Sequence, residues 1–426
     1  MRILMLAQFY PPVVGGEERH VLSLSEALAA RGHDVMVATM PHPQRPAHVV
    51  VRGVTIRSIP GALQRATPLF REQERPHAPP FPDPELTARL HLLIRDWKPH
   101  VVHAHNWLVH SFLPLRLRHR VGFVSTLHDC SLACAIKVMT RDGQHCEGPA
   151  PGRCLSCAGS HYGVMKGAVT AVAHAAFTRL HRRAADRFIV VSKAVAEWSG
   201  LAGGKIPYEV ISTFIADDIG APGAHEACAA DDLPPDGYLL FIGDVSRSKG
   251  VHVLIDAYAR LDNPPPLVLI GRRCADAPDR LPDNVRILGS RDHAAVLRAW
   301  SGCLFGLVPS VVRDACPTVV MEAAAMGKTV VASRNGGLME LIDDGVTGLL
   351  TPPGDAAALA AAMRALLVDP ARRDRLARAA LAKADSFRAR SVVPKIEALY
   401  RAVASPEVAA DGARHELEGD GLTASQ

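Results

Sequence analysis

The amino-acid sequence predicts an α/β protein built from two Rossmann-like domains, each a doubly wound parallel sheet covered by helices. The chain has 426 residues, which is enough for two domains of ordinary size, each with its own core. Arg2–Ala7 and Tyr238–Ile242 are short apolar runs typical of buried parallel strands. Each is followed by a glycine-containing loop and a helical pattern, which is how a nucleotide-binding half of a doubly wound sheet begins.

Composition places the chain among globular proteins and excludes several classes of partner. Apolar residues make up 48% of the sequence, and the formal net charge is +5. No cluster of lysines and arginines is interleaved with aromatic residues in the way typical of nucleic-acid surfaces, so we expect no DNA or RNA partner. The loop after the first strand lacks Gly-x-Gly-x-x-Gly, which disfavours a dinucleotide cofactor and therefore a nicotinamide oxidoreductase.

Neither of the two long apolar stretches predicts export or a membrane span. Met1–Tyr10 stops at Pro11 and lacks the hydrophobic length and the cleavage site of a signal peptide. Gly163–Phe177 is interrupted by Lys166 and His174 and is too short to cross a bilayer. We therefore expect a cytoplasmic protein whose thiols stay reduced.

The first domain is predicted over residues 1–215. Its first loop ends in Gly15 and Gly16, and Glu17–Arg31 repeats apolar residues at helical spacing. Further strands are expected over 34–39, 50–59, 101–105, 125–129, 188–191 and 208–212. Residues 61–84 are rich in proline without a clear period, which indicates a long functional loop such as a lid.

Two histidines lie at the ends of predicted strands in this domain. His105 closes the strand over 101–105, and His128 lies at the end of the strand over 125–129. Ligands of doubly wound folds bind at the carboxyl ends of the strands, where a histidine can hydrogen-bond a hydroxyl or a developing charge. Packing is the alternative role for both residues.

Five of the nine cysteines lie between Cys130 and Cys157. Cys134, Cys146, Cys154 and Cys157 end in a Cys-x-x-Cys pair and are separated by turn-forming residues. In a reducing compartment this grouping is typical of four thiolates on a structural zinc ion rather than of disulfides. The sequence leaves open the alternative of reduced cysteines with no metal.

A predicted helix over Tyr162–Arg183 ends in Arg179, His181, Arg182 and Arg183. Such a basic end can hold a protein to an anionic membrane surface. More often such an end is a solvated face that complements the helix dipole. Peripheral membrane contact is therefore one of two interpretations.

The second domain is predicted over residues 216–386, after a linker over 217–235 that is rich in Asp, Gly, Ala and Pro. Its first loop contains Arg247, Lys249 and Gly250. Further strands are expected over 266–271, 284–289, 303–308, 329–333 and 345–353, and helices over 293–300, 355–367 and 372–385. A last helical segment, 387–403, precedes residues 404–426, whose low apolar content predicts disorder.

The most informative stretch of the second domain places a proline-led helix between two acids. Pro317 cannot donate a backbone hydrogen bond and fits the first helical position, so the amides of Thr318, Val319 and Val320 are expected to point forward unpaired. A helix start of this kind attracts a diphosphate.

The two acids flank that diphosphate site. Glu322 is expected about 7 Å further along the axis on the face of Thr318, where a carboxylate can accept from two vicinal hydroxyls such as those of a ribose. Asp314 precedes the helix and is placed to reach a sugar on the other side. Taken alone, the two acids are better explained as a solvated helix acid, Glu322, and a turn residue, Asp314.

The wider segment resembles the donor-binding signature of glycosyltransferase family 4, the retaining enzymes of the GT-B fold. The two acids eight residues apart enclose Cys-Pro-Thr-Val-Val-Met, and Ala-Ala-Ala-Met-Gly-Lys follows; Gly336 and Gly337 then precede Glu340. A subset of bacterial family members resembles this chain in carrying a cysteine insertion, here residues 130–160. The similarity extends over nearly the whole chain and is strongest from Pro309 to Pro353.

Two positions depart from the family pattern. The family usually has glutamate at the position of Asp314, and it has an arginine where this chain has Asp244. Lys249 and Gly250 match the family's Lys-Gly pair, and Arg247, in the same loop, is the candidate replacement for the missing arginine.

The resemblance assigns roles residue by residue. It implies that Gly16 closes over the diphosphate and acceptor, that His128 is the acceptor-side histidine, and that His105 is a weaker candidate. The expected catalytic residues are His128, Asp314 and Lys249; the expected donor-binding residues are Gly16, Arg247, Lys249, Thr318, Val319, Glu322 and Gly337; the expected zinc ligands are Cys134, Cys146, Cys154 and Cys157. In the GT-B fold the last helix, here 387–403, crosses back to the first domain.

The implied activity is retaining transfer of a hexosyl group from a nucleotide-diphosphate sugar to a glycan, lipid-linked or small-molecule acceptor, as in polysaccharide biosynthesis. The chain contains no Asp-x-Asp, the acid pair that commonly holds the metal in metal-dependent glycosyltransferases, so no cofactor for catalysis is expected. Two alternatives stay open. One is a nucleotide-sugar-binding protein that has lost turnover, motivated by Asp244, and the other is a GT-B epimerase or phosphorylase.

Overall fold

The computed structural model describes residues 1–13, 15–63, 78–141, 144–221, 232–235 and 237–404. The predicted tail after Ala404, most of the proline-rich loop and much of the predicted linker lie outside these ranges. The chain divides into two compact units. Unit 1 contains residues 1–191 and 195–211 and the described residues from Val393 onward, and unit 2 contains residues 192–194 and 212–392.

Unit 1 is built on an eight-stranded sheet with the order β10-β9-β6-β5-β1-β2-β4-β3, in which every pairing is parallel except β3 with β4. The strands are β1 (Arg2–Leu6), β2 (Asp34–Thr39), β3 (His48–Val51), β4 (Val54–Ser58), β5 (Val101–Ala104), β6 (Gly122–Leu127), β9 (Arg187–Val190) and β10 (Tyr208–Val210). The order reverses between β1 and β5, so the loops that follow these two strands lie at the topological switch point.

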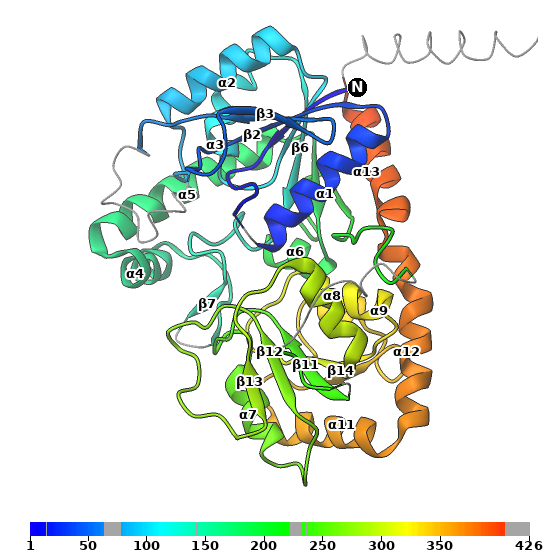
Figure 1. Ribbon diagram of the computed structural model, residues 1–426. Helices are drawn as coiled ribbons and strands as arrows, with labels where there is room; N and C mark the ends of the chain where they lie inside the picture. The colour runs from blue at the N-terminus through cyan, green and yellow to red at the C-terminus, as the bar shows by residue number, and fades with distance from the viewer. Residues whose placement is uncertain (14, 64–77, 142–143, 222–231, 236, 405–426) are drawn as a thin grey trace, which may run out of the picture. The chain divides into compact units, whose positions relative to one another are not determined.

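Helices flank this sheet (Figure 1). They are α1 (Gly16–Ala30), α2 (Pro84–Trp97), α3 (Val109–Phe112), α5 (Val164–Ala184) and α6 (Lys193–Trp198). The apolar stripe predicted for the first helix is confirmed, because Val21, Leu24 and Leu28 of α1 are fully buried. Asp83 caps α2 by accepting hydrogen bonds from the amides of Glu85 and Leu86.

One local expectation for unit 1 was wrong. The strand predicted over 50–59 is a hairpin of β3 and β4, because Arg52 and Gly53 both adopt positive φ and form a tight two-residue turn. The helix predicted over Tyr162–Arg183 is confirmed as α5, which begins two residues later because Gly163, with a φ of 87°, separates it from α4 (Pro151–Tyr162). A small hairpin of β7 (Thr140–Arg141) and β8 (Gln144–His145) precedes α4.

Unit 2 is a six-stranded, fully parallel sheet with the order β13-β12-β11-β14-β15-β16. The strands are β11 (Tyr238–Ile242), β12 (Leu267–Ile270), β13 (Val285–Ile287), β14 (Cys303–Val308), β15 (Val330–Ser333) and β16 (Leu349–Thr351). The helices are α7 (Val251–Tyr258), α8 (His293–Gly302), α9 (Thr318–Ala325), α10 (Leu338–Leu341), α11 (Ala356–Val368) and α12 (Pro370–Ala384). Counted along the chain, the strand order is 3-2-1-4-5-6, which confirms the doubly wound fold.

Helix α13 (Ala389–Val403) begins in unit 2 and belongs to unit 1 from Val393 onward. Its second half is tied to unit 1 by polar side chains. Glu397 accepts hydrogen bonds from Arg31, at 2.9 and 2.7 Å, and lies 2.8 Å from Nε2 of His33. The Tyr400 hydroxyl lies 2.6 Å from Nδ1 of the buried His103. Within the described part of the chain, no helix is both long and apolar enough to cross a bilayer.

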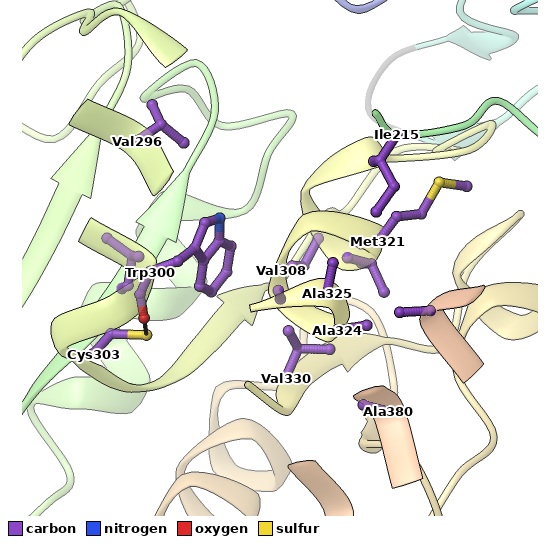
Figure 2. Packing of buried hydrophobic residues seen from close by; sticks show 14 of the residues in the cluster. Ile215, Val296, Trp300, Cys303, Val308, Met321, Ala324, Ala325, Val330 and Ala380 are labelled. Atoms are coloured by element: carbon purple, nitrogen blue, oxygen red, sulfur yellow. Dashed lines mark hydrogen bonds between the residues drawn. The ribbon is translucent and has the colours of Figure 1, made fainter. Parts of the chain in front are cut away.

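The core of unit 2 is packed around Trp300 of α8, which is 1% exposed (Figure 2). Gly306 on β14 lies against its ring. A Cβ on Gly306 would lie 2.5 Å from Cη2 of Trp300 and 3.1 Å from Cγ1 of Val330. The indole therefore occupies the space that a side chain at 306 would need.

We predict that Gly306→Ala lowers the free energy of unfolding by about 1–3 kcal/mol, because the added methyl group overpacks a filled core. Urea denaturation followed by circular dichroism measures the change. Gly152→Ala is the matched control, since its Cβ would meet nothing within 4 Å. An unchanged denaturation midpoint for Gly306→Ala would contradict this packing.

Candidate active site

Two loops meet backbone to backbone at the switch point of unit 2. They follow β11 and β14, the strands between which the strand order reverses. A Cβ on Gly250, which has a φ of 75°, would lie only 1.9 Å from the carbonyl oxygen of Pro309. The amides of Val311 and Val312 both donate to the carbonyl of Ser248, at 3.1 and 3.3 Å. Only glycine at position 250 permits this approach.

A third loop, after β15, fastens the same segment from the other side. The amide of Gly337 donates to the carbonyl of Asp314 at 2.8 Å, and a Cβ on Gly337 would lie 1.9 Å from the carbonyl oxygen of Ala315. Nδ2 of Asn335 donates to the carbonyl of Val312 at 2.7 Å. Gly337 was expected to bind the donor, but its amide is already used, so its contribution here is to hold the loop that carries Asp314.

The packed loops bring Lys249 and Asp314 together. Nζ of Lys249 lies 2.8 Å from Oδ2 of Asp314, and the hydroxyl of Ser310 donates to the same oxygen at 2.7 Å. Burial lowers the pKa of Lys249, but the charge of Asp314 and its hydrogen bond outweigh that effect, so the pKa lies above its usual value. The lysine is therefore a fixed cation, and its ammonium group has further N–H donors for an incoming anion.

Helix α9 begins one residue later than the sequence indicated. Pro317 has an extended backbone (ψ 113°) and is the N-cap, so Thr318 is the first helical residue. The amide of Val320, expected to be unpaired, donates to the carbonyl of Pro317 at 3.2 Å. Among the described residues, the amides of Thr318 and Val319 have no acceptor. The start of α9 therefore offers two unpaired amides instead of the three predicted, together with the positive end of the helix dipole.

Glu322 of α9 is 2% exposed and lies 3.0 Å, through Oε1, from Nε2 of His293. His293 is the first residue of α8, whose N-cap Asp292 accepts from the amide of Ala295. The sequence did not identify His293 as a site residue, because 29 positions and a strand separate it from Glu322. The sequence signal that could have identified His293 is its position directly after a loop at the carboxyl end of a strand, where ligands of this fold bind.

Asp244, the acid that replaces the family's arginine, has its charge balanced by a neighbouring side chain. Asp244 forms a 2.9 Å ion pair with Arg272, from the loop after β12. Arg247, the predicted replacement for the family arginine, is exposed; its amide donates to Asp276 and its carbonyl accepts from the amide of Gly250, and its guanidinium has no hydrogen-bond partner among the described residues. The structure therefore places two arginines in or next to this loop, of which Arg272 was not anticipated.

In unit 1, the loops after β5 and β6 bring His105 and His128 together. Nδ1 of His105 lies 3.1 Å from Nε2 of His128, and the ring of His20, from α1, packs edge-on against His128 with centroids 5.0 Å apart. His103, under this pair, is hydrogen-bonded to Tyr400 and to the Thr126 hydroxyl.

These imidazoles are held neutral. Burial lowers the pKa of His103 and His128 to about 3, and neighbouring histidines add to the effect. The pKa values of His20 and His105 are lowered well below their usual range for the same reason. A neutral His128 can donate or accept a hydrogen bond but carries no charge at neutral pH.

Gly16 is the first residue of α1, at the loop that follows β1. A Cβ at this position would meet nothing within 4 Å, so packing within the described chain does not require glycine. The bare backbone leaves room for close approach of a ligand.

The neighbouring Glu17 was not anticipated by the sequence. It accepts a hydrogen bond from Asn106, and burial raises its pKa to about 8. Asn106 is itself positioned by the amide of Gln8, which donates to its Oδ1 at 3.0 Å. The loops after β1 and β5 are thereby linked at the switch point of unit 1.

The four cysteines predicted to bind zinc, Cys134, Cys146, Cys154 and Cys157, line a single cavity in unit 1. This cavity is separate from the histidine cluster, whose residues do not line it.

Comparison with known proteins identifies similar chains over almost the full length. A family model described as Glycosyltransferase Family 4 matches residues 14–218, and one described as Glycosyl transferases group 1 matches residues 236–369. The chain is 32% identical to glycogen synthase from Mycobacterium tuberculosis over 415 residues, 89% of each chain. It is 26% identical to the phosphatidyl-myo-inositol mannosyltransferase of the same species, over 95% of this chain and 97% of that one.

Solved structures agree on the fold. Sucrose-phosphate synthase from Thermosynechococcus elongatus superimposes with a TM-score of 0.72 at 22% identity, covering 94% of this chain and 98% of that one. Anabaena HepE in complex with UDP-glucose gives 0.68 at 19% identity, covering 94% and 100%. Two doubly wound units with these relatives define a glycosyltransferase of the GT-B fold. Within that class, the chain belongs to glycosyltransferase family 4.

The neutral histidines predict that the protein loses stability in acid. Unfolded histidines take up protons near pH 6.5, whereas folded His103 and His128 do so only near pH 3. The free energy of unfolding should therefore fall as the pH drops below 6.5, by up to about 1.4 kcal/mol per pH unit for each histidine. Melting temperatures between pH 7.5 and 5.5 measure the effect.

The matched variants are His103→Gln, which should flatten the pH dependence, and His48→Gln, an exposed histidine, which should leave it unchanged. A slope for His103→Gln equal to that of the unmodified protein would refute the assignment.

Proposed function

We propose that this glycosyltransferase moves a hexosyl group from a nucleotide-diphosphate sugar to an acceptor hydroxyl, with retention of configuration and without a catalytic metal. One observation carries the proposal: Lys249, Asp314 and the amide end of α9 lie in one rigid loop cluster at the switch point of unit 2. Doubly wound sheets bind phosphate-containing ligands at this place. The UDP and UDP-glucose complexes of Anabaena HepE support a nucleotide-sugar donor.

The diphosphate is assigned to the amides of Thr318 and Val319 and to Lys249. A helix start supplies N–H donors and a partial positive charge, and Lys249 supplies a full one. Lys249 can contact a phosphate oxygen while it keeps its bond to Asp314, because an ammonium group has three donors. Arg247, whose side chain is exposed, supplies the second cation.

Glu322 is assigned to the ribose. It accepts from His293 through Oε1, and an ionised carboxylate has room for about four hydrogen bonds, so ribose hydroxyls can bind beside the histidine. Asp314 is assigned to the donor sugar. Its Oδ2 accepts from Lys249 and Ser310, which leaves Oδ1 for a sugar hydroxyl.

The chemistry proposed is electrostatic. As the bond between the anomeric carbon and the diphosphate breaks, negative charge develops on the leaving oxygen, and Lys249 with the α9 amides stabilises it. The acceptor hydroxyl attacks from the face that the leaving group vacates, and its proton passes to the leaving phosphate. His128, held neutral, is assigned to hydrogen bonding on the acceptor side. A metal has no assigned part in these steps.

The pairing of Asp244 with Arg272 weakens the alternative of a binding protein without turnover. That alternative assumed a negative charge where the family has an arginine. A paired Asp244 repels a diphosphate less than a free one does.

An epimerase or phosphorylase would act without an acceptor glycan, and product analysis with the donor alone separates these activities from transfer. The glycogen synthase relative favours a glycan acceptor and a role in polysaccharide biosynthesis.

We predict that Glu322→Ala and His128→Ala fail in different ways. Glu322→Ala should weaken binding of the nucleoside diphosphate at least tenfold, because a charge-assisted bond to the ribose is lost. His128→Ala should bind it normally and lose transfer. Isothermal titration with UDP and other nucleoside diphosphates, and a transfer assay in the presence of chelator, measure the two effects. The nucleotide is first chosen by thermal stabilisation across a panel of nucleotide sugars.

Normal nucleotide affinity in Glu322→Ala would overturn the ribose assignment. Dependence of transfer on added divalent metal, or a product of inverted anomeric configuration by NMR, would overturn the proposed mechanism.

Helix α5 supports a second proposal, peripheral contact with an anionic membrane surface. Val164, Met165, Val169 and Val172 are 84%, 83%, 55% and 62% exposed. Met165, Val169 and Val172 are spaced i, i+4 and i+7, so they share one face of the helix. Exposed Lys166, Arg179 and Arg183 supply the complementary positive charge. Such contact would suit a lipid-linked acceptor and a cytoplasmic protein that works at the inner membrane surface.

We predict that the protein sediments with vesicles containing anionic lipid and not with neutral vesicles. Replacing Val169 and Val172 by serine should reduce sedimentation at least severalfold, since burial of these side chains in the interface is lost. Val368→Ser is the control, because Val368 is 74% exposed but lies in unit 2. Equal sedimentation with both kinds of vesicle would dispose of the membrane contact.

A further inference from the structure

The four cysteines of the segment 130–163 come from three separate places and line one small cavity of about 30 Å³. Cys134 lies in the turn that follows Cys130, Cys146 follows strand β8, and Cys154 and Cys157 lie on α4. Among the described residues, the rest of the lining includes no histidine and no carboxylate, and its charged groups are Arg141 and Arg153. The metal ligands that the described lining offers are therefore thiols, which select a soft metal such as zinc.

Local hydrogen bonds bring the three places together. The hairpin of β7 and β8 returns the chain so that the amide of Cys146 donates to the carbonyl of Met139 at 2.8 Å. Cys154 and Cys157 are three residues apart on α4 and therefore share one face. Both lie in the first two turns of that helix.

The segment has little apolar material of its own. Only five of its hydrophobic residues are buried: Cys130, Leu132, Ala135, Met139 and Ala158. A module with so small a core is typically stabilised by a metal or by disulfides. All eight cysteines in the described part of the chain are free thiols, so disulfides do not take this role.

Four thiolates in one cavity carry four negative charges, and the positive side chains of the described lining are Arg141 and Arg153. A divalent cation among the sulfur atoms would neutralise two of these charges directly.

We propose that Cys134, Cys146, Cys154 and Cys157 bind one structural zinc ion as thiolates. Binding converts four thiols and Zn²⁺ into a tetrathiolate complex and releases four protons. With zinc–sulfur bonds of about 2.3 Å, the sulfur atoms of a tetrahedral site lie roughly 3.8 Å apart. The ion draws the turn, the hairpin and α4 together at this spacing.

The zinc ion would also fix the loop that leaves β6. The hydroxyl of Tyr162, at the end of α4, donates to the carbonyl of Ala135 at 3.0 Å. Nε2 of His174, on α5, donates to the carbonyl of Ser131 at 2.7 Å. The loop that begins with His128 is thus held by α4 and α5, and zinc would hold α4. The inference concerns the order of this segment and does not depend on the proposed transfer reaction.

A competing metal site lies in the same unit. The ligand atoms of His20, His105 and His128 all lie within 4.8 Å of one another, and in the described part of the chain this is the one group of three or more such residues close enough to hold a metal ion; the sulfur atoms of the four cysteines are spaced more widely. However, His105 and His128 already share a hydrogen bond, so one of the two nitrogens carries a proton and has no lone pair for a metal. Variants of the two clusters distinguish the sites.

The test measures the zinc content of the full-length protein, purified without added metal or chelator, by mass spectrometry of the element. The expected result is about one zinc ion per chain, retained through dialysis. Replacement by Co²⁺ should give the thiolate-to-cobalt charge-transfer absorption of a site with sulfur ligands. Cys154→Ser with Cys157→Ser should abolish both signals, whereas the control Cys274→Ser should keep them.

Three outcomes would overturn the proposal: zinc well below one ion per chain after loading with Zn²⁺, retention of zinc in the double cysteine variant, or loss of zinc in His105→Gln. Zinc that dialysis removes indicates an adventitious ion only and also counts against it. If the double variant does not fold, the cobalt spectrum of the unmodified protein still decides the ligand type.

Hydrogen exchange provides a structural readout. Chelator should raise amide exchange at least tenfold in residues 130–163 while β1 and β5 stay protected, because the sheet is stabilised by its own core. Unchanged exchange in this segment after zinc removal would contradict a structural role.

Discussion

The close approach of backbones in unit 2 is the constraint on which the candidate donor site depends. Gly250, Gly271 and Gly337 each lie where a Cβ would be 1.9 Å from a carbonyl oxygen of another loop. Because no other residue fits, four loops from the carboxyl ends of parallel strands, those after β11, β12, β14 and β15, can pack directly against one another. The stacking puts Lys249 against Asp314, with Ser310 completing the bond. The position of Asp314 is therefore set by backbone contacts rather than by its own side chain.

The candidate donor site of unit 2 and the histidine cluster of unit 1 differ in the polar groups they contain. Unit 2 keeps charged groups and pairs them: Lys249 with Asp314, and Asp244 with Arg272. Unit 1 keeps histidines neutral by burial, with His103 satisfied by Tyr400 and Thr126. This division suits a reaction in which the donor carries a charged diphosphate and the acceptor is a neutral hydroxyl, because desolvated charges are useful only where a charge has to be bound.

Two wrong predictions of element boundaries have a common cause. Pro317 was assigned inside the helix and is its cap, and residues 50–59 were assigned to one strand and form a hairpin. In both cases residue preference was correct, but the observed backbone angles, such as positive φ at Arg52, decided the boundary. Propensities are averages, and a single residue that departs from them moves the end of an element.

The sequence by itself determined the two doubly wound halves, because strand and helix periods and glycine positions are local properties of the chain. It also determined the family, and it singled out Lys249, Asp314, Glu322, His128 and the four cysteines. Only the tertiary structure decided which of these meet: that Asp314 pairs with Lys249, that His293 lies against Glu322, that Arg272 neutralises Asp244, and that the cysteines line one cavity. The physical reason is that these contacts join residues 23 to 65 positions apart in the sequence, or residues at the ends of different strands. The distances between such residues depend on the strand order and on how the loops pack, and the sequence pattern gives neither.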